Sequence, residues 1–307
     1  MEKFLAEFPI QSIELENPKY PASLKQILDP PKVLYFRGNF LTGNEKCFAI
    51  VGTRLASDYG KEIAFSIAKD LAKAVLTIVS GMARGIDSFS HQGALEAGKG
   101  SPSPIGEGLP FSIPTIAVLG TGLDEASIYP QENLKLAKKI LESGGALISE
   151  YPPGTKGAKF TFPQRNRIIA GISLGVLVVE AKIKSGALIT AHFGRQQKKK
   201  IFAVPGPIHS RNSQGCHLLI KQGAKLVENA NDILKELGLT QLVSQRPTAA
   251  SQEEQLIFNA LRQGAMSIDK IIEITKLSAQ TTSVNLSMME IENKVKNLGG
   301  NVYALTR

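Results

Sequence analysis

The chain has 307 residues, of which 43% are hydrophobic and 21% charged, enough apolar content to bury one large core and a smaller one. No run of about 18 apolar residues is present to span a bilayer. The first ten residues, MEKFLAEFPI, include acids and a proline where a secretory signal needs a basic start and a long apolar stretch. We therefore expect a cytoplasmic protein that does not bind a membrane.

The net charge of +9 is concentrated in one part of the chain. Lys156 to Lys225 contains thirteen Lys and Arg and one acid, Glu180, so this segment carries +12 and the rest of the chain carries −3. A solvated basic surface is the simplest interpretation of a charged segment. Because so one-sided a segment repels itself unless an anionic partner is near, we favour a polyanion, with nucleic acid the first candidate.

Residues 1–45 form an N-terminal segment punctuated by prolines, and NPKYPASLKQILDPPKVLYFRG within it predicts one short helix and one edge strand. Residues 46–236 alternate short apolar runs with longer helical stretches. The runs are CFAIVGTR, LTIVSGMARG, TIAVLGTG, ALISEYPPG, GVLVVEAK and KIFAVPG. Strands without polar alternation are buried on both faces, and helices between them imply parallel crossovers. We predict an α/β fold, an extended Rossmann-like doubly wound, mostly parallel sheet, with a surface loop at 98–113.

Residues 237–250 lose this periodicity and predict a linker, and residues 251–307 predict a small C-terminal winged-helix domain. Apolar positions in this domain fit three short helices, and VKNLGGNVYAL fits a glycine-turned hairpin. No Lys or Arg occurs between Lys276 and Lys294, so the expected recognition helix lacks the side chains that read DNA bases. We favour protein contact or weak auxiliary binding for this domain over specific DNA reading.

Cations follow several of the predicted strands, at the edge where ligands of parallel sheets bind. Gly52-Thr53-Arg54 closes the first run and can present N–H groups and a guanidinium to a phosphate, although a tight turn with a surface cation has the same pattern. Gly81 and Arg84 follow the second run in the same way. Arg54, Arg84, Lys156, Lys159 and Lys182 all stand at predicted strand ends.

The signatures of enzymes and of cofactor or metal sites are incomplete or missing in this sequence. Ser80, Asp87 and His91 suggest a hydrolase, but Asp87 and His91 are four apart on one predicted helix and Ser80 is not in a nucleophile elbow. Gly120-Thr121-Gly122 lacks the third glycine of a dinucleotide fingerprint, and no GxxxxGK[ST] occurs. The basic segment has one carboxylate, and Cys47 and Cys216 are far apart without ligand-like neighbours. We predict no catalytic residue, no cofactor and no metal.

The stretch KFTFPQRNRIIAGIS, Lys159 to Ser173, places cations beside aromatic rings. A binder of single strands combines a cationic groove with rings on which bases stack. Lys159, Phe162, Arg165 and Arg167 supply both. Burial of Phe160 and Phe162 in the core is the alternative, and we favour Phe162 as the exposed ring.

Taken together, these residues closely resemble the DNA-processing protein A (DprA, or Smf) family. The matching pieces, in family order from about Tyr20 to Val227, are YPASLKQILDPPKVLYFRG, AIVGTR, SGMARGID, TIAVLGTGLD, IYPQEN, ISEYPPG, FPQRNRIIAGIS, VVEA, SGALITA, FAVPG and LIKQGA. The resemblance implies a non-enzymatic, dimeric protein that binds and protects incoming single-stranded DNA and helps to load the recombinase RecA in natural transformation. The residues expected at the DNA are Gly52, Thr53, Arg54, Gly81, Arg84, Lys159, Phe162, Arg165, Asn166, Arg167, Lys182, Ser185 and Gly186.

Two other functions remain open at this point. A phosphoribohydrolase-like nucleotide enzyme on the same fold carries PGGxGTxxE, whereas this chain has LGTGLDE without a preceding Pro-Gly-Gly. A sequence-specific regulator acting through the winged helix needs a basic recognition helix, which is missing.

Overall fold

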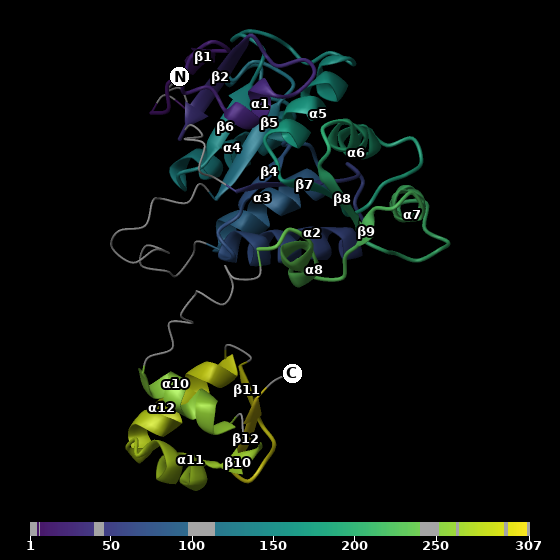
Figure 1. The fold of residues 1–307 in the computed structure, drawn as a ribbon. Coiled ribbons are helices and arrows are strands. Elements are labelled where there is room, and N and C mark those ends of the chain that lie inside the picture. Colours follow the sequence, from purple (N-terminus) through teal and green to yellow (C-terminus); the bar gives the residue numbers. More distant parts are fainter. Residues whose placement is uncertain are drawn as a thin grey trace. The chain divides into compact units, whose positions relative to one another are not determined.

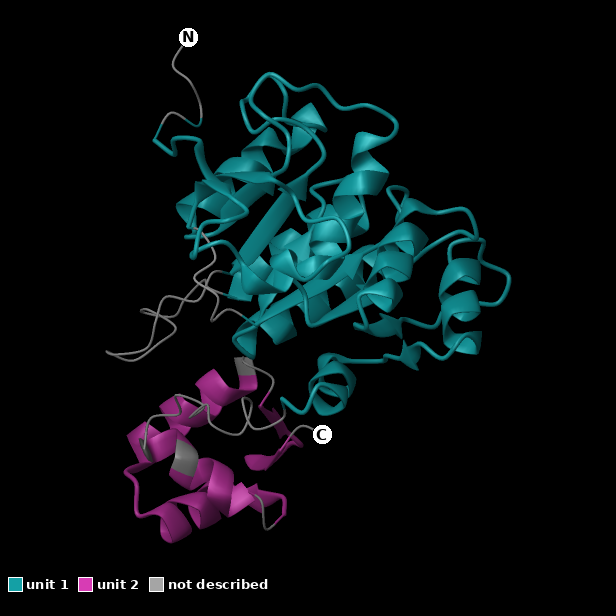
Figure 2. Cartoon of the chain, turned by 45° about the horizontal axis from the view of Figure 1, so that its top comes forward, with its two compact units in different colours: residues 1–242 teal, residues 243–307 magenta. Residues whose placement is uncertain are grey.

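The computed structural model describes residues 5, 7–39, 46–97, 114–239, 252–261, 264–291 and 294–305. The chain divides into two compact units, residues 1–242 and 243–307 (Figure 2). The predicted loop at 98–113 and most of the predicted linker at 237–250 lie outside the described residues. Within the described ranges, no helix is both long and apolar enough to cross a bilayer.

The first unit is built on a nine-stranded sheet with the strand order β1-β2-β6-β5-β4-β3-β7-β8-β9 (Figure 1). The strands are β1 (Gln11–Glu14), β2 (Val33–Gly38), β3 (Cys47–Val51), β4 (Thr77–Ser80), β5 (Thr115–Leu119), β6 (Ala146–Ser149), β7 (Gly175–Val178), β8 (Lys200–Ala203) and β9 (Lys225–Leu226). β1, β2 and β6 pair antiparallel, and every other neighbouring pair is parallel. The six predicted runs are β3 to β8, which confirms the doubly wound α/β prediction. The N-terminal segment adds two strands rather than one, and β9 was not predicted.

Helices cover both faces of the sheet. They are α1 (Ala22–Lys25), α2 (Asp58–Lys73), α3 (Ile86–Ala97), η1 (Gln131–Asn133), α4 (Leu134–Glu142), α5 (Thr161–Gly171), α6 (Gly186–Gln196), α7 (Gln214–Lys221) and α8 (Ala230–Glu236). Side chains from α1, α5, α6 and α7 pack on one face, and those from α2, α3, α4 and α8 pack on the other (Figure 1).

The alternation of side chains along each strand explains this layering. Val79 faces the cluster that contains α5 and α6, whereas Ile78, one residue earlier, faces the cluster that contains α2 and α3. Both side chains are fully buried, which is why the strand sequences show no polar alternation. The same arrangement aligns the loops that follow the parallel strands along one edge of the sheet.

The described part of the second unit has three helices and a three-stranded sheet, the winged-helix outline that was predicted. Its elements are α10 (Gln252–Leu261), β10 (Met266–Ser267), α11 (Ile268–Thr275), α12 (Ala279–Ile291), β11 (Val295–Asn297) and β12 (Val302–Leu305). Ile257, Ile271, Leu286 and Met289 form its core. Val284 and Met288 on α12 are exposed, and the surface of this helix carries no positive charge, in accord with its lack of Lys and Arg.

Candidate nucleic-acid interface

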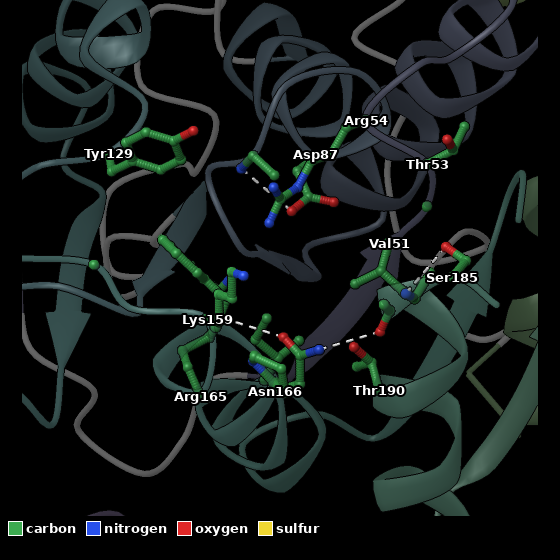
Figure 3. A pocket seen from close by; sticks show the side chains of 18 of the residues that line it. Val51, Thr53, Arg54, Asp87, Tyr129, Lys159, Arg165, Asn166, Ser185 and Thr190 are labelled. Atoms are coloured by element: carbon green, nitrogen blue, oxygen red, sulfur yellow. Dashed lines mark hydrogen bonds between the residues drawn. The ribbon is translucent and has the colours of Figure 1, made fainter.

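A pocket of about 850 Å³ opens at the carboxyl ends of the parallel strands (Figure 3). In the sheet, β4 to β6 lie on one side of β3 and β7 to β9 on the other, so the strand order reverses between β3 and β7. Loops that leave neighbouring strands in opposite directions open a crevice, which is the usual ligand site of such sheets. We call this cavity the switch-point pocket, and its lining residues fall within 51–55, 83–87, 126–131, 156–169 and 182–190.

The fold brings most of the predicted DNA-binding residues together in this pocket. Those that line it are Gly52, Thr53, Arg54, Lys159, Phe162, Arg165, Asn166, Lys182, Ser185 and Gly186. The other three, Gly81, Arg84 and Arg167, are not among the lining residues.

The pocket is lined by five exposed cations: Arg54, Lys156, Lys159, Lys182 and Lys184. No described carboxylate forms an ion pair with any of the five. Among the lining residues, the only acid is Asp87, and it is buried. Lys156 and Lys184 were not in the predicted set, although both lie in the segment whose charge is +12. The pocket is therefore an electrostatic site for an anion.

Phe162 lies against the side chains that surround the pocket opening. The guanidinium carbon of Arg54 is 5.6 Å from the centroid of the Phe162 ring, and the ring of Tyr129 is 5.5 Å from it. A Cβ at Gly157 would come within 2.6 Å of the Phe162 ring, so this glycine allows the close approach of its loop. Tyr129 is half-exposed and was not predicted as a site residue, although it belongs to the IYPQEN piece of the resemblance.

The prediction that Phe162 is the exposed ring was wrong in one respect. Phe160 is 68% exposed and does not line the pocket, whereas Phe162 is partly buried and does. α5 begins at Thr161, so the two rings do not follow an extended alternation, and only Phe162 turns into the pocket.

Arg165 forms the floor of the pocket and is buried. It donates to the backbone oxygens of Val118 and Gly81, the latter at 2.8 Å, and to Asn166 Oδ1 at 3.2 Å. Gly81 is needed because a Cβ there would come within 2.6 Å of the guanidinium. Burial lowers the pKa of Arg165 to about 10, against the attraction of Asp87, and burial also raises the pKa of Asp87. Arg165 is thus held by the protein itself and offers little free surface to a ligand.

The other two predicted arginines are occupied outside the pocket. Arg167 is buried, and its two Nη atoms donate to the carboxylate of Glu150 at 2.6 and 2.7 Å while Nε donates to Asp29 O at 2.8 Å. Arg84 is exposed and forms an ion pair with Glu132 at 2.6 Å. The Arg-Asn-Arg triplet therefore stabilises the fold, contrary to our expectation that it supplies free cations.

Hydrogen bonds hold the turn that carries Arg54 and the turn that begins α6. Thr53 is buried, its N–H donates to Glu180 O at 2.7 Å, and its hydroxyl accepts from Leu55 N at 3.2 Å. Ser185 caps α6, accepting from Ala187 N at 3.4 Å. The exposed N-terminus of α6 therefore faces the pocket together with the lysines of the preceding loop, a favourable place for an anion.

Ser80, Asp87 and His91 do not form a catalytic relay. The Ser80 hydroxyl donates to Ile50 O at 2.6 Å, and His91 Nδ1 lies 2.7 Å from the hydroxyl of Thr115. His91 is fully buried, and burial lowers its pKa to about 3. A histidine so placed is a neutral core residue at physiological pH.

Within the described ranges, no cluster of His, Cys, Asp and Glu has the arrangement to hold a metal ion. Cys47 and Cys216 are both buried and are not joined in a disulfide, and burial raises the pKa of Cys216 to about 12. The Cys216 thiol is thus protonated at neutral pH, and both thiols are shielded from solvent.

Comparison with known protein families gives two matches. The family model described as DNA recombination-mediator protein A matches residues 11–238, and the model of the DprA winged helix domain matches residues 243–301. The chain is 40% identical over 251 residues to Protein Smf of Escherichia coli, covering 77% of this chain and 63% of that protein, so it spans less than two thirds of that relative. It is 42% identical over 229 residues to DNA processing protein DprA of Bacillus subtilis, covering 74% and 71% of the two chains.

Solved structures that resemble the fold include two of proteins named DNA processing protein A. DNA processing protein A of Streptococcus pneumoniae has a TM-score of 0.64 and 38% identity, with 76% of this chain and 75% of that chain covered. DNA processing protein A of Helicobacter pylori, whose structure is described as giving insight into its single-stranded DNA binding mode, has a TM-score of 0.63 and 28% identity, with 80% and 100% covered.

Proposed function

The chain belongs to the DNA-processing protein A family, and on this premise we propose that it binds single-stranded DNA in the switch-point pocket. A single strand presents phosphates that cations neutralise and unstacked bases that a ring can cover. The observation that carries the proposal is the position of Phe162, a partly exposed ring in a pocket with five cations that form no ion pair with a described carboxylate. The structure of the H. pylori protein is described as giving insight into its single-stranded DNA binding mode, which supports the proposal.

The side chains of the pocket contact different parts of the DNA strand in this proposal. Arg54, Lys156, Lys159, Lys182 and Lys184 are placed to contact phosphates, and Phe162 to stack on a base. Ser185 and Gly186 at the start of α6 offer backbone N–H groups to a further phosphate. Because phosphate contacts dominate, the affinity should fall steeply with salt and depend little on sequence.

The role that the family resemblance implies completes the proposal. We propose that the chain acts as a dimer in the cytoplasm, without catalysis, protects incoming DNA during natural transformation and helps to load RecA on it. The B. subtilis and S. pneumoniae relatives are named as DNA processing proteins, which supports a role in DNA processing.

The experiment is a fluorescence-anisotropy titration of a labelled oligonucleotide, single-stranded against duplex, at several salt concentrations. Arg54→Ala should weaken binding and reduce the slope of log K against log salt by about 0.7, the value for one phosphate contact on a single strand. Phe162→Ala should cost about 1–3 kcal/mol of binding and leave the slope unchanged.

The structure offers two matched controls. Phe160→Ala removes a more exposed ring two residues away that does not line the pocket, and Arg84→Ala removes an exposed guanidinium paired with Glu132. Both variants should bind as the wild type does. Absence of binding at low salt would refute the proposal and make nucleotide hydrolysis the next assay.

A further inference from the structure

Three large aliphatic side chains are exposed on adjacent loops beside the switch-point pocket. Leu55 follows β3 and is 74% exposed, Ile183 follows β7 and is 57% exposed, and Ile208 follows β8 and is 76% exposed. Single exposed apolar residues are ordinary on protein surfaces, but several beside one binding pocket mark an interaction surface.

Hydrogen bonds hold these three loops to one another. Asn212, in the loop after β8, donates from its side-chain amide to Leu55 O at 3.1 Å and accepts at its backbone oxygen from Ala181 N at 2.6 Å. Tyr59 of α2 donates its hydroxyl to Pro205 O at 3.0 Å, which ties the start of the same loop to α2. The loops that carry the three aliphatic residues are therefore joined to one another.

The charges on this surface are positive. Lys182, Lys184 and Arg211 are exposed, and no described carboxylate forms an ion pair with them. Two acids near this surface already have partners. Glu180 is buried and accepts from Ser57 Oγ at 2.6 Å, and Asp58 is paired with Lys61 at 2.8 Å.

The surface is continuous with the pocket, because Leu55, Lys182 and Lys184 line the pocket wall while Ile183 lies between the two lysines. We propose that Leu55, Ile183, Ile208, Lys182, Lys184 and Arg211 form a ledge on which the same DNA strand continues after it leaves the pocket. Bases pack on the aliphatic side chains while the cations neutralise the flanking phosphates. The charge pattern favours this occupant over a protein partner, since the aliphatic groups are interspersed with unpaired cations. The ledge rests on the proposed function and extends it.

The test compares oligothymidines of about 4 and about 12 nucleotides, because the ledge is reached only by the longer strand. The variant is Ile183→Ser with Ile208→Ser, neither of which lines the pocket. It should bind the short oligonucleotide as the wild type does and the long one about tenfold more weakly. Arg211→Ala should reduce the salt slope by about 0.7 for the long oligonucleotide alone.

Leu174→Ser is the matched control, since Leu174 is 41% exposed and precedes β7 at the opposite edge of the sheet. It should bind both oligonucleotides as the wild type does, and thermal unfolding should show all variants folded. Unchanged binding of the long oligonucleotide by the double variant would overturn the ledge while leaving the pocket intact, and would make a protein partner the better occupant. Equal weakening on both lengths would also overturn it. Failure of the wild type to bind either length would instead refute the proposed function, and the ledge with it.

Discussion

Replacing Arg165 by Gln should damage the fold rather than remove a DNA contact. The substitution leaves Asp87 buried without its nearby guanidinium and removes the bonds to Gly81 O and Val118 O. Leaving a buried charge and two buried carbonyl oxygens without the nearby cation costs about 3–5 kcal/mol, because these groups keep their desolvation penalty. In a unit of 242 residues, each kcal/mol shifts Tm by about 2–4 °C, so we expect a fall of about 10 °C.

Thermal unfolding of the full chain, followed by far-UV circular dichroism, measures this fall. Arg54→Ala is the comparison, because Arg54 is exposed without an ion pair among the described residues, so its loss should leave Tm unchanged and weaken DNA binding. Adding Asp87→Asn to Arg165→Gln should recover part of the stability, since no unpaired charge then remains buried. A wild-type Tm for Arg165→Gln together with a reduced salt slope would refute this reasoning and make Arg165 a direct phosphate ligand.

Two further predictions concern His91 and Tyr129. Burial lowers the pKa of His91 to about 3 from 6.5, so the stability from its neutral form is complete above pH 6.5 and is lost as pH falls toward 3. Between pH 6.5 and about pH 5 the free energy of unfolding should fall by about 2 kcal/mol, and His91→Gln should reduce this fall. Urea unfolding at the two pH values measures it. An equal fall in the wild type and the variant would contradict the assignment. Tyr129→Ala should weaken single-strand binding by about 1 kcal/mol because the Tyr129 ring packs beside Phe162, whereas Tyr129→Phe should bind as the wild type does in the same anisotropy assay. Equal losses in the two Tyr129 variants would assign the effect to the hydroxyl rather than the ring.

The prediction of the α/β fold from the sequence succeeded because its signals are local. The six runs that became β3 to β8 are short, apolar and separated by helical stretches. β9 has two residues, Lys225 and Leu226, and both are exposed, so no burial pattern was available to reveal it. β1, the N-terminal strand that was not predicted, differs from the parallel strands in the same way, since three of its four residues are exposed.

The candidate site was predicted less completely. The sequence identified Arg54, Lys159 and Phe162 by their place after predicted strands and beside other cations, and the structure places all three in one pocket. It could not distinguish a free arginine from one already engaged, because the partners lie far along the chain. Arg167 pairs with Glu150, 17 residues away, and bonds to the backbone of Asp29, 138 residues away.

The sequence by itself determined the fold class, the family and the segment that carries the excess positive charge, because periodicity, motif order and composition are properties of neighbouring residues. Only the tertiary structure decided which cations remain free, which ring enters the pocket, and that loops after β3, β7 and β8 form one surface. These features depend on which side chains from distant segments pack together and which of them form ion pairs. The carboxylate of Glu150 pairs with Arg167, whereas Arg54 stays exposed in the crevice between diverging loops.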